Sequence, residues 1–517
     1  MADAPDSLRS ATGGPIDDLA ATTGDRLTHE EVKGRAASGV ALLLGRGVAF
    51  RGLGFLGSLV LARLLTPEDF GLVALGLTLV GFGQWLATSG IGEALVGRPE
   101  PPTRAELRSV AGYQLAITVV AGGAAATIAA LTVDGGVVTA FMMLALPLTA
   151  YRTPAMLTLQ RQLAFGSTVR VELVETIVYL VFAIALAAAG LGAWSLAIAT
   201  VVRYGVGTAV ACRLSPAGFL LPSIDFGPLR SIIGFGARFQ ATGAIHIGHD
   251  LLLNAGILAV AGTAQLGLWN FAWRVLQIPY LLFDAMFNVG FPAFSRLMEG
   301  GDPAALRRLV QRAVSAVAVG ITALLCPLVA VSPAMVPLLF GDKWSDVALI
   351  LPGAAVALAV YGPVGIVTYS FMYASGDAST SIVGSLLGGG TRLASTLLLL
   401  PVLGVGAVGL GWAIGGVAEL PWVLKRMRER SGAALTGRVL RPAIAGIVAG
   451  GLGWLVCDEL GRNLPSAGAA FGVAVAAFAG LMAVAGREDV AHTTSTARRM
   501  VALLKSRRAT PTSPAGA

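Results

Sequence analysis

The sequence predicts an all-α membrane protein with about fourteen transmembrane helices, and three observations support this fold class. The chain has 517 residues, of which 55% are hydrophobic and only 13% charged, whereas a soluble domain carries about 25% charged residues. Its mean hydropathy of +0.76 means that most of its surface must face lipid. Its 67 glycines are typical of helices that pack closely within a bilayer.

Stretches long and apolar enough to span a bilayer recur along the whole chain, since a span needs about twenty mostly apolar residues. The predicted spans are centred near Gly52, Leu79, Thr118, Leu144, Val178, Ala199, Gly248, Tyr280, Val317, Ala359, Leu393, Ala413, Ala449 and Ala474. The polar start of the chain lacks the apolar core of a cleavable signal peptide.

The distribution of positive charge predicts the topology. With the N-terminus inside, the 37 lysines and arginines divide into 28 in inside segments, three in outside loops and six within spans. Positive residues concentrate on the cytoplasmic side of membrane proteins, so we expect both termini in the cytoplasm. The six within spans are Arg46, Arg51, Arg203, Arg238, Arg274 and Arg392.

The two halves of the chain resemble each other. ARLLTPEDFGLVALG at 62–76 corresponds to AVAGTAQLGLWNFAW at 259–273, and PTRAELRSV at 102–110 corresponds to DPAALRRLV at 302–310. Both copies begin on the inside, which predicts a parallel repeat of two six-helix bundles, and transporters place their sites between such halves. The expected domains are a disordered cytoplasmic tail at 1–35, bundles at 36–214 and 215–430, a further helix pair at 431–486 and a basic cytoplasmic tail at 487–517.

Polar side chains form one stripe on each of two neighbouring spans. Ionisable residues inside a bilayer are costly and are therefore functional candidates. The seventh span carries Arg238, Thr242, His246, His249 and Asp250 at helical spacing. The eighth carries Asn270, Arg274, Gln277, Asp284 and Asn288. Two such stripes predict a hydrated surface between the helices.

Three segments carry a family resemblance. LARLLTPEDFGLVALGLTLVGFGQWLATSGIGEALVGR at 61–98, FPAFSR at 291–296 and FGDKW at 340–344 resemble segments of bacterial polysaccharide flippases of the multidrug, oligosaccharidyl-lipid and polysaccharide exporter superfamily. The resemblance extends over about residues 39–432. It implies two bundles around a central cavity that opens alternately to each side. It also implies that an undecaprenyl-pyrophosphate-linked oligosaccharide moves from the inner to the outer leaflet of the bacterial plasma membrane.

A pyrophosphate cannot enter hydrocarbon unpaired, and guanidinium groups pair with phosphate oxygens bidentately. We therefore predict a pyrophosphate site made of Arg46, Arg51, Arg238 and Arg274. Side-chain amides would bond to the sugars from Asn270, Gln277 and Asn288. Alternatively, the arginines form structural ion pairs with Asp250, Asp284 or Glu419, or reach an interface.

Titratable residues in the same stripes suggest ion coupling, because imidazoles and buried carboxylates can exchange protons near neutral pH. The candidates are His246, His249, Asp250 and Asp284. A structural contact between histidine and aspartate is the alternative. Glu175 in the fifth span is expected to pair with a nearby loop arginine, and the turn at 66–71 to shape the first hairpin without contacting cargo.

Other function classes fit the sequence less well. Cys212, Cys326 and Cys457 are expected to be buried thiols, and we predict no metal site, cofactor or nucleic-acid partner. A drug or cation antiporter of the same superfamily remains the nearest alternative, and a membrane-embedded glycan polymerase or transferase is a more distant one. No nucleophile motif or large outer loop supports an enzyme. The expected partners are membrane lipids and, as a further candidate, polysaccharide synthesis enzymes.

Overall fold

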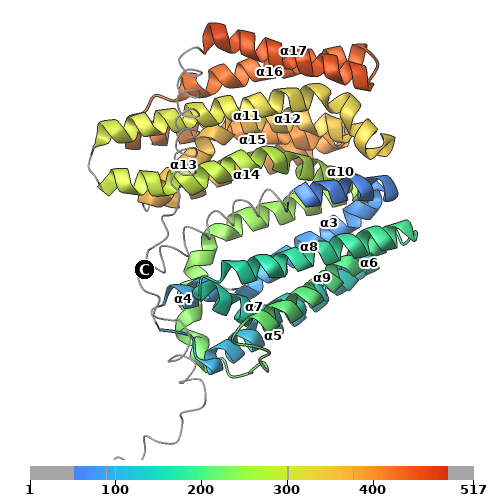
Figure 1. Cartoon of the computed structure of the whole chain (residues 1–517), viewed down its shortest axis with the longest axis vertical. Helices are drawn as coiled ribbons and strands as arrows, with labels where there is room; N and C mark the ends of the chain where they lie inside the picture. Colours follow the sequence, from blue (N-terminus) through green and yellow to red (C-terminus); the bar gives the residue numbers. More distant parts are fainter. Residues whose placement is uncertain are drawn as a thin grey trace, which may run out of the picture. The chain divides into compact units, whose positions relative to one another are not determined.

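A computed structural model of the chain describes residues 50–486, apart from 51, 89, 99, 300, 301, 376 and 377. Both predicted tails lie outside the described residues. All regular elements within the described range are helices (Figure 1). The bounds are α3 Pro67–Thr88, α4 Ile91–Gly97, α5 Arg104–Thr132, α6 Gly136–Met142, α7 Ala145–Arg161, α8 Phe165–Ala188, α9 Ala193–Leu214, η2 Gly227–Leu229, α10 Arg230–Glu299, α11 Pro303–Phe340, η3 Asp342–Trp344, α12 Val347–Val360, α13 Gly362–Ser375, α14 Ala378–Leu403, α15 Gly406–Ser431, α16 Thr436–Glu459 and α17 Leu464–Ala485.

Among the residues that the structure describes, twelve helical stretches are long and apolar enough to cross a membrane, so the chain is a multi-pass membrane protein and the predicted fold class is confirmed. One of them, Gly243–Asp284, contains the centres of two predicted spans, and the shorter apolar helix Gly52–Leu64 contains another. The described helices are therefore compatible with the predicted fourteen spans. Large apolar side chains such as Leu398 and Val402 are about 80% exposed, as expected for surfaces that face lipid.

The helix α10 is two helices joined at a sharp turn. Gly262 has φ 83° and ψ −178°, which is not a helical conformation. A side chain at this φ would be strained, so glycine allows the chain to turn directly from one helix into the next. The seventh and eighth predicted spans are connected in this way.

Side chains cap the helices that follow polar loops. At the start of α3, the backbone N–H of Thr66 donates to the Asp69 carboxylate at 2.9 Å, and the Asp69 N–H donates to the Thr66 hydroxyl at 3.3 Å. At the start of α11, Asp302 accepts from the backbone N–H groups of Ala304 and Ala305. Such bonds satisfy helix N–H groups that have no intrahelical partner. They also lower the pKa of the Asp302 carboxyl.

The chain divides into two compact units, which we call unit 1 and unit 2. Unit 1 comprises Met1–Leu65 and Leu72–Ile247, and unit 2 comprises Thr66–Gly71 and Gly248–Ala517. The division after residue 247 differs from the bundle boundary predicted at 214/215.

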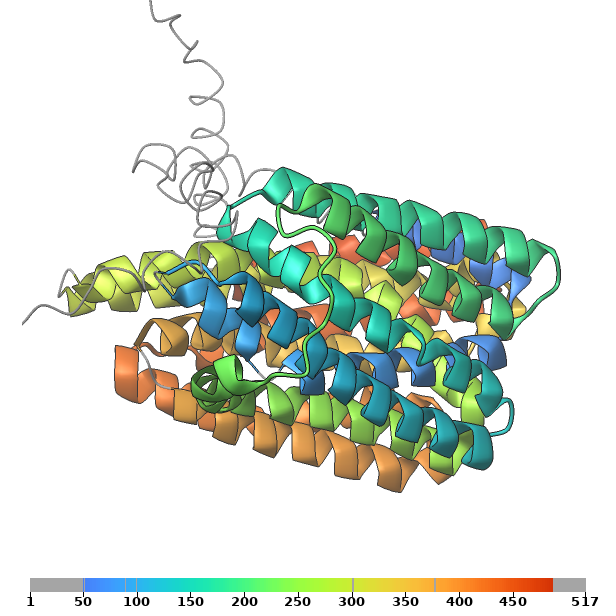
Figure 2. The ribbon, with the colours of Figure 1, turned by 90° about the horizontal axis from the view of Figure 1, so that it is seen from below.

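Hydrogen bonds attach the first part of the segment 215–247 to the helices of unit 1. After α9, an extended segment crosses to α5, where Ser223 donates its N–H to the Arg108 carbonyl oxygen at 2.9 Å (Figure 2). Arg108 in turn donates from Nε to the Leu221 carbonyl oxygen at 2.9 Å. These bonds connect two loop residues with a helix more than a hundred positions earlier, which periodicity along the sequence does not reveal.

Within unit 1, α8 packs on α9, and α7 packs on both α5 and α9. One core cluster joins three of these helices and consists of Ala155, Val171, Ala211 and Cys212. Within unit 2, α14 packs on α15, while the C-terminal helices α16 and α17 pack on each other and on α11 (Figure 1). Small residues dominate the contact of α11 with α16 and α17: Ala330, Ala334, Cys457, Ala467, Ala470 and Ala474. Close packing through small residues is typical of helices in a bilayer.

Aromatic rings pack the start of α3, which belongs to unit 2, against other residues of that unit. Phe70 makes edge contacts with Phe271 and Trp344, at ring centroid distances of 5.7 and 5.1 Å. Phe271 and Trp344 lie 4.2 Å apart and are at most 1% exposed. The TPEDFG and FGDKW segments therefore meet in one packed cluster, which gives them a structural role.

Candidate functional site

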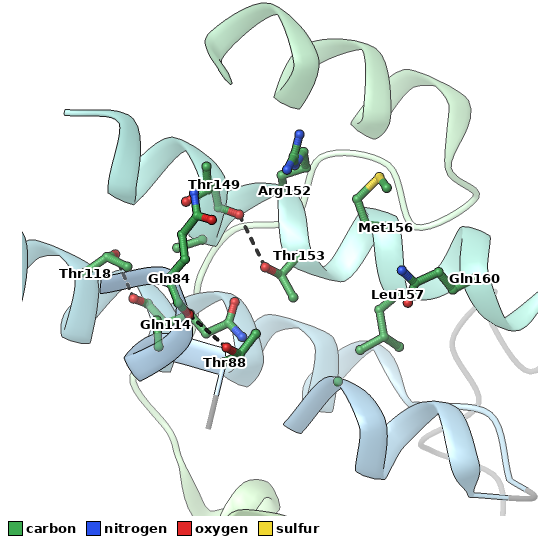
Figure 3. Close-up of a pocket in the computed structure, with 13 residues that line it drawn as sticks. Gln84, Thr88, Gln114, Thr118, Thr149, Arg152, Thr153, Met156, Leu157 and Gln160 are labelled. Carbon is green, nitrogen blue, oxygen red and sulfur yellow. Dashed lines mark hydrogen bonds between the residues drawn. The ribbon is translucent and has the colours of Figure 1, made fainter. Parts of the chain in front are cut away.

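A cavity of about 600 Å³, lined mainly by residues with polar side chains, lies within unit 1. It is formed by α3, α4, α5 and α7, whose residues surround it in Figure 3. The lining residues are Gln84, Ala87, Thr88, Gly92, Gln114, Thr118, Thr149, Ala150, Arg152, Thr153, Met156, Leu157 and Gln160. Most of the polar ones are amides and hydroxyls, so the cavity offers hydrogen bonds with little charge.

Two buried amides in this cavity lack a protein partner. Gln114 on α5 is 1% exposed, and its Nε2 makes no hydrogen bond to any described residue. The buried Nε2 of Gln84 on α3 is in the same situation. Buried polar groups are normally hydrogen-bonded, so each such exception requires an explanation.

The threonines around the cavity are bonded differently. Thr88, Thr118 and Thr149 donate their hydroxyl hydrogens to carbonyl oxygens of their own helices, at 2.8, 2.7 and 2.8 Å. This pattern is common for threonine in apolar helices. It leaves the hydroxyl oxygens of Thr118 and Thr149 as acceptors.

Arg152 on α7 forms an ion pair with Glu175 on α8. Its guanidinium also lies 5.7 Å from the ring centroid of Tyr204. A second arginine, Arg203, donates to the Tyr204 hydroxyl at 3.0 Å and lies 4.6 Å from the same ring. The prediction that Glu175 pairs with an arginine is confirmed, but its partner lies on a helix rather than in a loop. Hydropathy alone assigns Arg152 to an inside segment, because it stands near the end of an apolar stretch.

A polar cluster in unit 2 joins α10 to α14. Arg392 donates from Nε to His249 Nε2 at 3.1 Å, and its guanidinium lies 4.8 Å from the ring centroid of Trp412. Its Nη2 is 3.7 Å from an Asp250 carboxylate oxygen. The histidine–aspartate contact that the sequence offered as an alternative is present, since His249 Nδ1 lies 3.4 Å from Asp250 Oδ1.

Glu419 lies on α15 and accepts a hydrogen bond from the Tyr361 hydroxyl at 2.6 Å. Two glycines of α14 make room for the carboxylate: a Cβ at Gly384 or Gly388 would lie within 2.7 Å of one of its oxygens. The neighbouring helices thus enclose this side chain, which is 6% exposed.

The other predicted site residues are placed as follows. The Arg274 guanidinium lies 5.4 Å from the ring centroid of Phe70, and Asn270 donates to the Leu266 carbonyl oxygen at 3.0 Å. Gln277 and Asp284 are exposed on α10. The side chains of Arg238, His246 and Asn288 lie outside the described part, and so do the residues Arg46 and Arg51. The structure thus brings together His249 and Asp250, and it adds Arg392 to them.

Sequence reasoning missed the cavity of unit 1. Gln84, Gln114 and Thr118 are single neutral residues in apolar helices, so they hardly lower the local hydropathy. The available signal was their spacing, since Gln84 and Thr88 are one turn apart, as are Gln114 and Thr118. This spacing is too common to be specific by itself.

Comparison with known proteins gives consistent relatives. The profile of a family described as polysaccharide biosynthesis protein matches residues 60–349, more than half of the chain. The profile of the lipid II flippase MurJ matches residues 255–457.

The chain is 25% identical over 316 residues to the lipopolysaccharide biosynthesis protein WzxC of Escherichia coli K12. This match covers 58% of the chain and 62% of WzxC, which is less than two thirds of that relative. The chain is 24% identical over 451 residues to the succinoglycan biosynthesis transport protein ExoT of Rhizobium meliloti 1021, covering 80% of this chain and 85% of ExoT.

Solved structures show the same fold. The lipid II flippase MurJ in an inward closed conformation matches with a TM-score of 0.65 at 12% identity, covering 87% of this chain and all of MurJ. A multidrug resistance MATE family transporter in an inward-facing conformation matches with a TM-score of 0.58 at 16% identity, covering 73% and 94% of the two chains. Given the extent of the family match and the helical membrane fold, the chain belongs to the polysaccharide biosynthesis protein family.

Proposed function

We propose that the chain is a flippase for cell-surface polysaccharide biosynthesis. It moves a polyprenyl-pyrophosphate-linked oligosaccharide from the inner to the outer leaflet of the bacterial plasma membrane by alternating access. The single observation that carries this proposal is a cavity of about 600 Å³, lined mainly by residues with amide and hydroxyl side chains, in a helical membrane protein of this family. The names of WzxC, ExoT and the MurJ profile support the same type of cargo.

The cargo explains why polar groups lie inside apolar helices. Sugar hydroxyls and phosphates lose their hydrogen bonds to water when they enter hydrocarbon, at a cost of several kcal/mol for each group. A polar path within the protein replaces those bonds, while the polyprenyl chain can remain in lipid. The amides and hydroxyls of unit 1 and the Arg392 cluster of unit 2 supply such groups.

Within this proposal, four arginines hold the pyrophosphate: Arg46, Arg51, Arg238 and Arg274. Three amides bond to sugars: Asn270, Gln277 and Asn288. The exposed side chain of Gln277 supports such a role, because it is accessible within unit 2. For Arg274, the neighbouring Phe70 ring supports a fixed orientation of the guanidinium, since a cation over an aromatic face is attracted by it.

The membrane potential can drive this movement. A cell interior negative by 100 mV favours outward transfer of each negative charge by about 2.3 kcal/mol. Both termini lie in the cytoplasm, and the basic end of α15 with Lys425, Arg426, Arg428 and Arg430 contacts the anionic inner leaflet. Polysaccharide synthesis enzymes that make the cargo are the expected partners at this side.

A drug or cation antiporter is the nearest rival. Cationic drugs need carboxylates or aromatic faces, whereas the described residues that line the unit 1 cavity include one arginine and no carboxylate. The charge of this lining therefore favours the polysaccharide cargo. A polymerase or transferase would need catalytic groups, and the relatives are named for transport and biosynthesis.

Deleting the gene in its source organism tests the proposal. We expect loss of a cell-surface polysaccharide and accumulation of its lipid-linked oligosaccharide in the inner leaflet. Restoring the gene should reverse both effects. Unchanged surface polysaccharide together with increased sensitivity to cationic drugs would favour the antiporter.

A further inference from the structure

We propose that the cavity of unit 1 binds the uncharged sugar portion of the cargo through the side-chain amides of Gln84 and Gln114, and that it does not bind the pyrophosphate. This inference rests on the proposed function and adds to it the chemical class of group that enters this cavity. Neither glutamine belongs to the stripes on α10 that the sequence predicts as the cargo site.

The first argument is the two unpaired amides. The Nε2 atoms of Gln84 and Gln114 are buried and have no hydrogen-bond partner within the described chain. Because the two glutamines lie on different helices and both residues line the cavity, a single ligand can approach both side chains. Whichever way each amide is turned, one of its polar ends remains available. A buried donor without an acceptor is costly, so a ligand that supplies acceptors is favoured here.

The second argument is that the cavity offers acceptors beside these donors. The hydroxyl hydrogens of Thr118 and Thr149 are donated to their own helices, so their oxygens can only accept. A sugar hydroxyl both donates and accepts, and it can therefore bond to an amide and a threonine oxygen together. An ionised phosphate only accepts and would leave the threonine oxygens without a partner.

The third argument is charge. Arg152 is the charged residue among the described ones that line the cavity, and Glu175 already pairs with it. A pyrophosphate placed here would keep most of its negative charge uncompensated by the protein. A neutral glycan carries no such cost. The volume of about 600 Å³ is also within the range of about 300–1,000 Å³ that is usual for sites binding small molecules.

The experiment measures binding to the full-length chain in lipid nanodiscs. Two probes are compared: undecaprenyl pyrophosphate carrying a glucose disaccharide, and undecaprenyl pyrophosphate without sugar. The test variant is Gln84→Leu combined with Gln114→Leu, which keeps the side-chain volume and removes both amides. The matched control is Gln265→Leu on α10, because its amide oxygen is likewise buried and unpaired but lies in unit 2.

We expect the wild-type chain to bind the sugar-bearing probe more tightly than the sugar-free one. The double variant should lose roughly tenfold in affinity for the sugar-bearing probe and keep its affinity for the sugar-free probe. The control should change neither affinity. The inference is overturned if the wild-type chain binds both probes equally, if the double variant weakens both equally, or if it weakens neither.

Two further measurements keep the result interpretable. If the double variant does not fold, Gln114→Met is measured in the same assay in its place. We expect this single variant to show a smaller loss of affinity for the sugar-bearing probe and no loss for the sugar-free probe. Movement of the probes between leaflets separates this inference from the proposed function. If the wild-type chain moves neither probe, the proposed function is contradicted. If the double variant binds and moves the sugar-bearing probe as well as the wild-type chain does, only this inference is contradicted.

Discussion

Gly71 and Gly267 lie within one residue of equivalent positions in the two repeats, and each allows the other repeat's backbone to approach it. A Cβ on Gly71 would lie 1.9 Å from the Thr263 carbonyl oxygen, and a Cβ on Gly267 would lie 1.8 Å from the Pro67 carbonyl oxygen. Thr263 is four residues before Gly267, as Pro67 is four residues before Gly71. The contacts are therefore reciprocal, which supports the internal repeat predicted from the sequence.

This close approach predicts a strong effect of a single methyl group. Gly71→Ala would place its Cβ against backbone, which cannot move aside as a flexible side chain can, so we expect a loss of about 2 kcal/mol in stability. Gly81→Ala is the matched control on the same helix, because nothing lies within 4 Å of its Cβ position. Thermal unfolding in detergent should show a lower midpoint for Gly71→Ala and an unchanged or slightly higher one for Gly81→Ala. Equal midpoints for the two variants would refute the contact.

The same region shows what the sequence could and could not predict. Hydropathy located the spans, and the predicted centres at Leu393 and Ala413 lie within α14 and α15. The order of the family segments was also visible, but the contact of Phe70 with Trp344 was not, because it joins residues that are far apart in the chain. Packing of this kind depends on the tertiary fold, which no local pattern encodes.

The candidate site was predictable only where it carries charge. Arg392 was recognised as an arginine within a span, but its partner His249 is 143 residues away. Gln84 and Gln114 were missed because a neutral amide hardly changes the hydropathy of an apolar helix. Functional candidates that are charged can therefore be recognised within a span from the sequence alone, whereas neutral hydrogen-bonding candidates such as Gln84 and Gln114 can be recognised only from the structure.

The pyrophosphate hypothesis makes Arg274 the first residue to change among the described ones. Arg274→Ala removes a bidentate donor, and we expect the rate of movement of an undecaprenyl-pyrophosphate-linked probe to fall roughly tenfold. Arg274→Lys should retain part of the rate, since lysine keeps the charge but not the planar fork. Arg296→Ala, an exposed change on the same helix, is the control. Full activity of a correctly folded Arg274→Ala protein would remove this residue from the site.

The coupling hypothesis predicts a response to a proton gradient. We expect transport in proteoliposomes to change several-fold when the gradient is reversed, and to lose this response when His246 and His249 are both replaced by Asn. His249 accepts a hydrogen bond from Arg392, which fixes the position of its ring. Measurements at equal ionic strength with and without an ionophore provide the control. Transport that ignores both the gradient and the two substitutions would leave these histidines with a structural role.

The ion pair of Arg152 with Glu175 predicts that removing one partner destabilises the protein more than removing both. Arg152→Leu leaves a carboxylate with little exposure unpaired, which costs about 3 kcal/mol. Replacing both residues by Leu removes the pair together and should restore much of that loss. Thermal unfolding of Arg152→Leu, Glu175→Leu and the double leucine variant measures this coupling. Additive losses in the double variant would show that the two side chains do not stabilise each other.

The most direct test of the account is leaflet-resolved movement of a labelled undecaprenyl-pyrophosphate disaccharide by the purified chain in liposomes. We predict that the label becomes accessible to an impermeant quencher faster than in protein-free liposomes, and that ethidium, a cationic drug, is not transported. A labelled lipid that remains in its leaflet while ethidium crosses would contradict the proposed function.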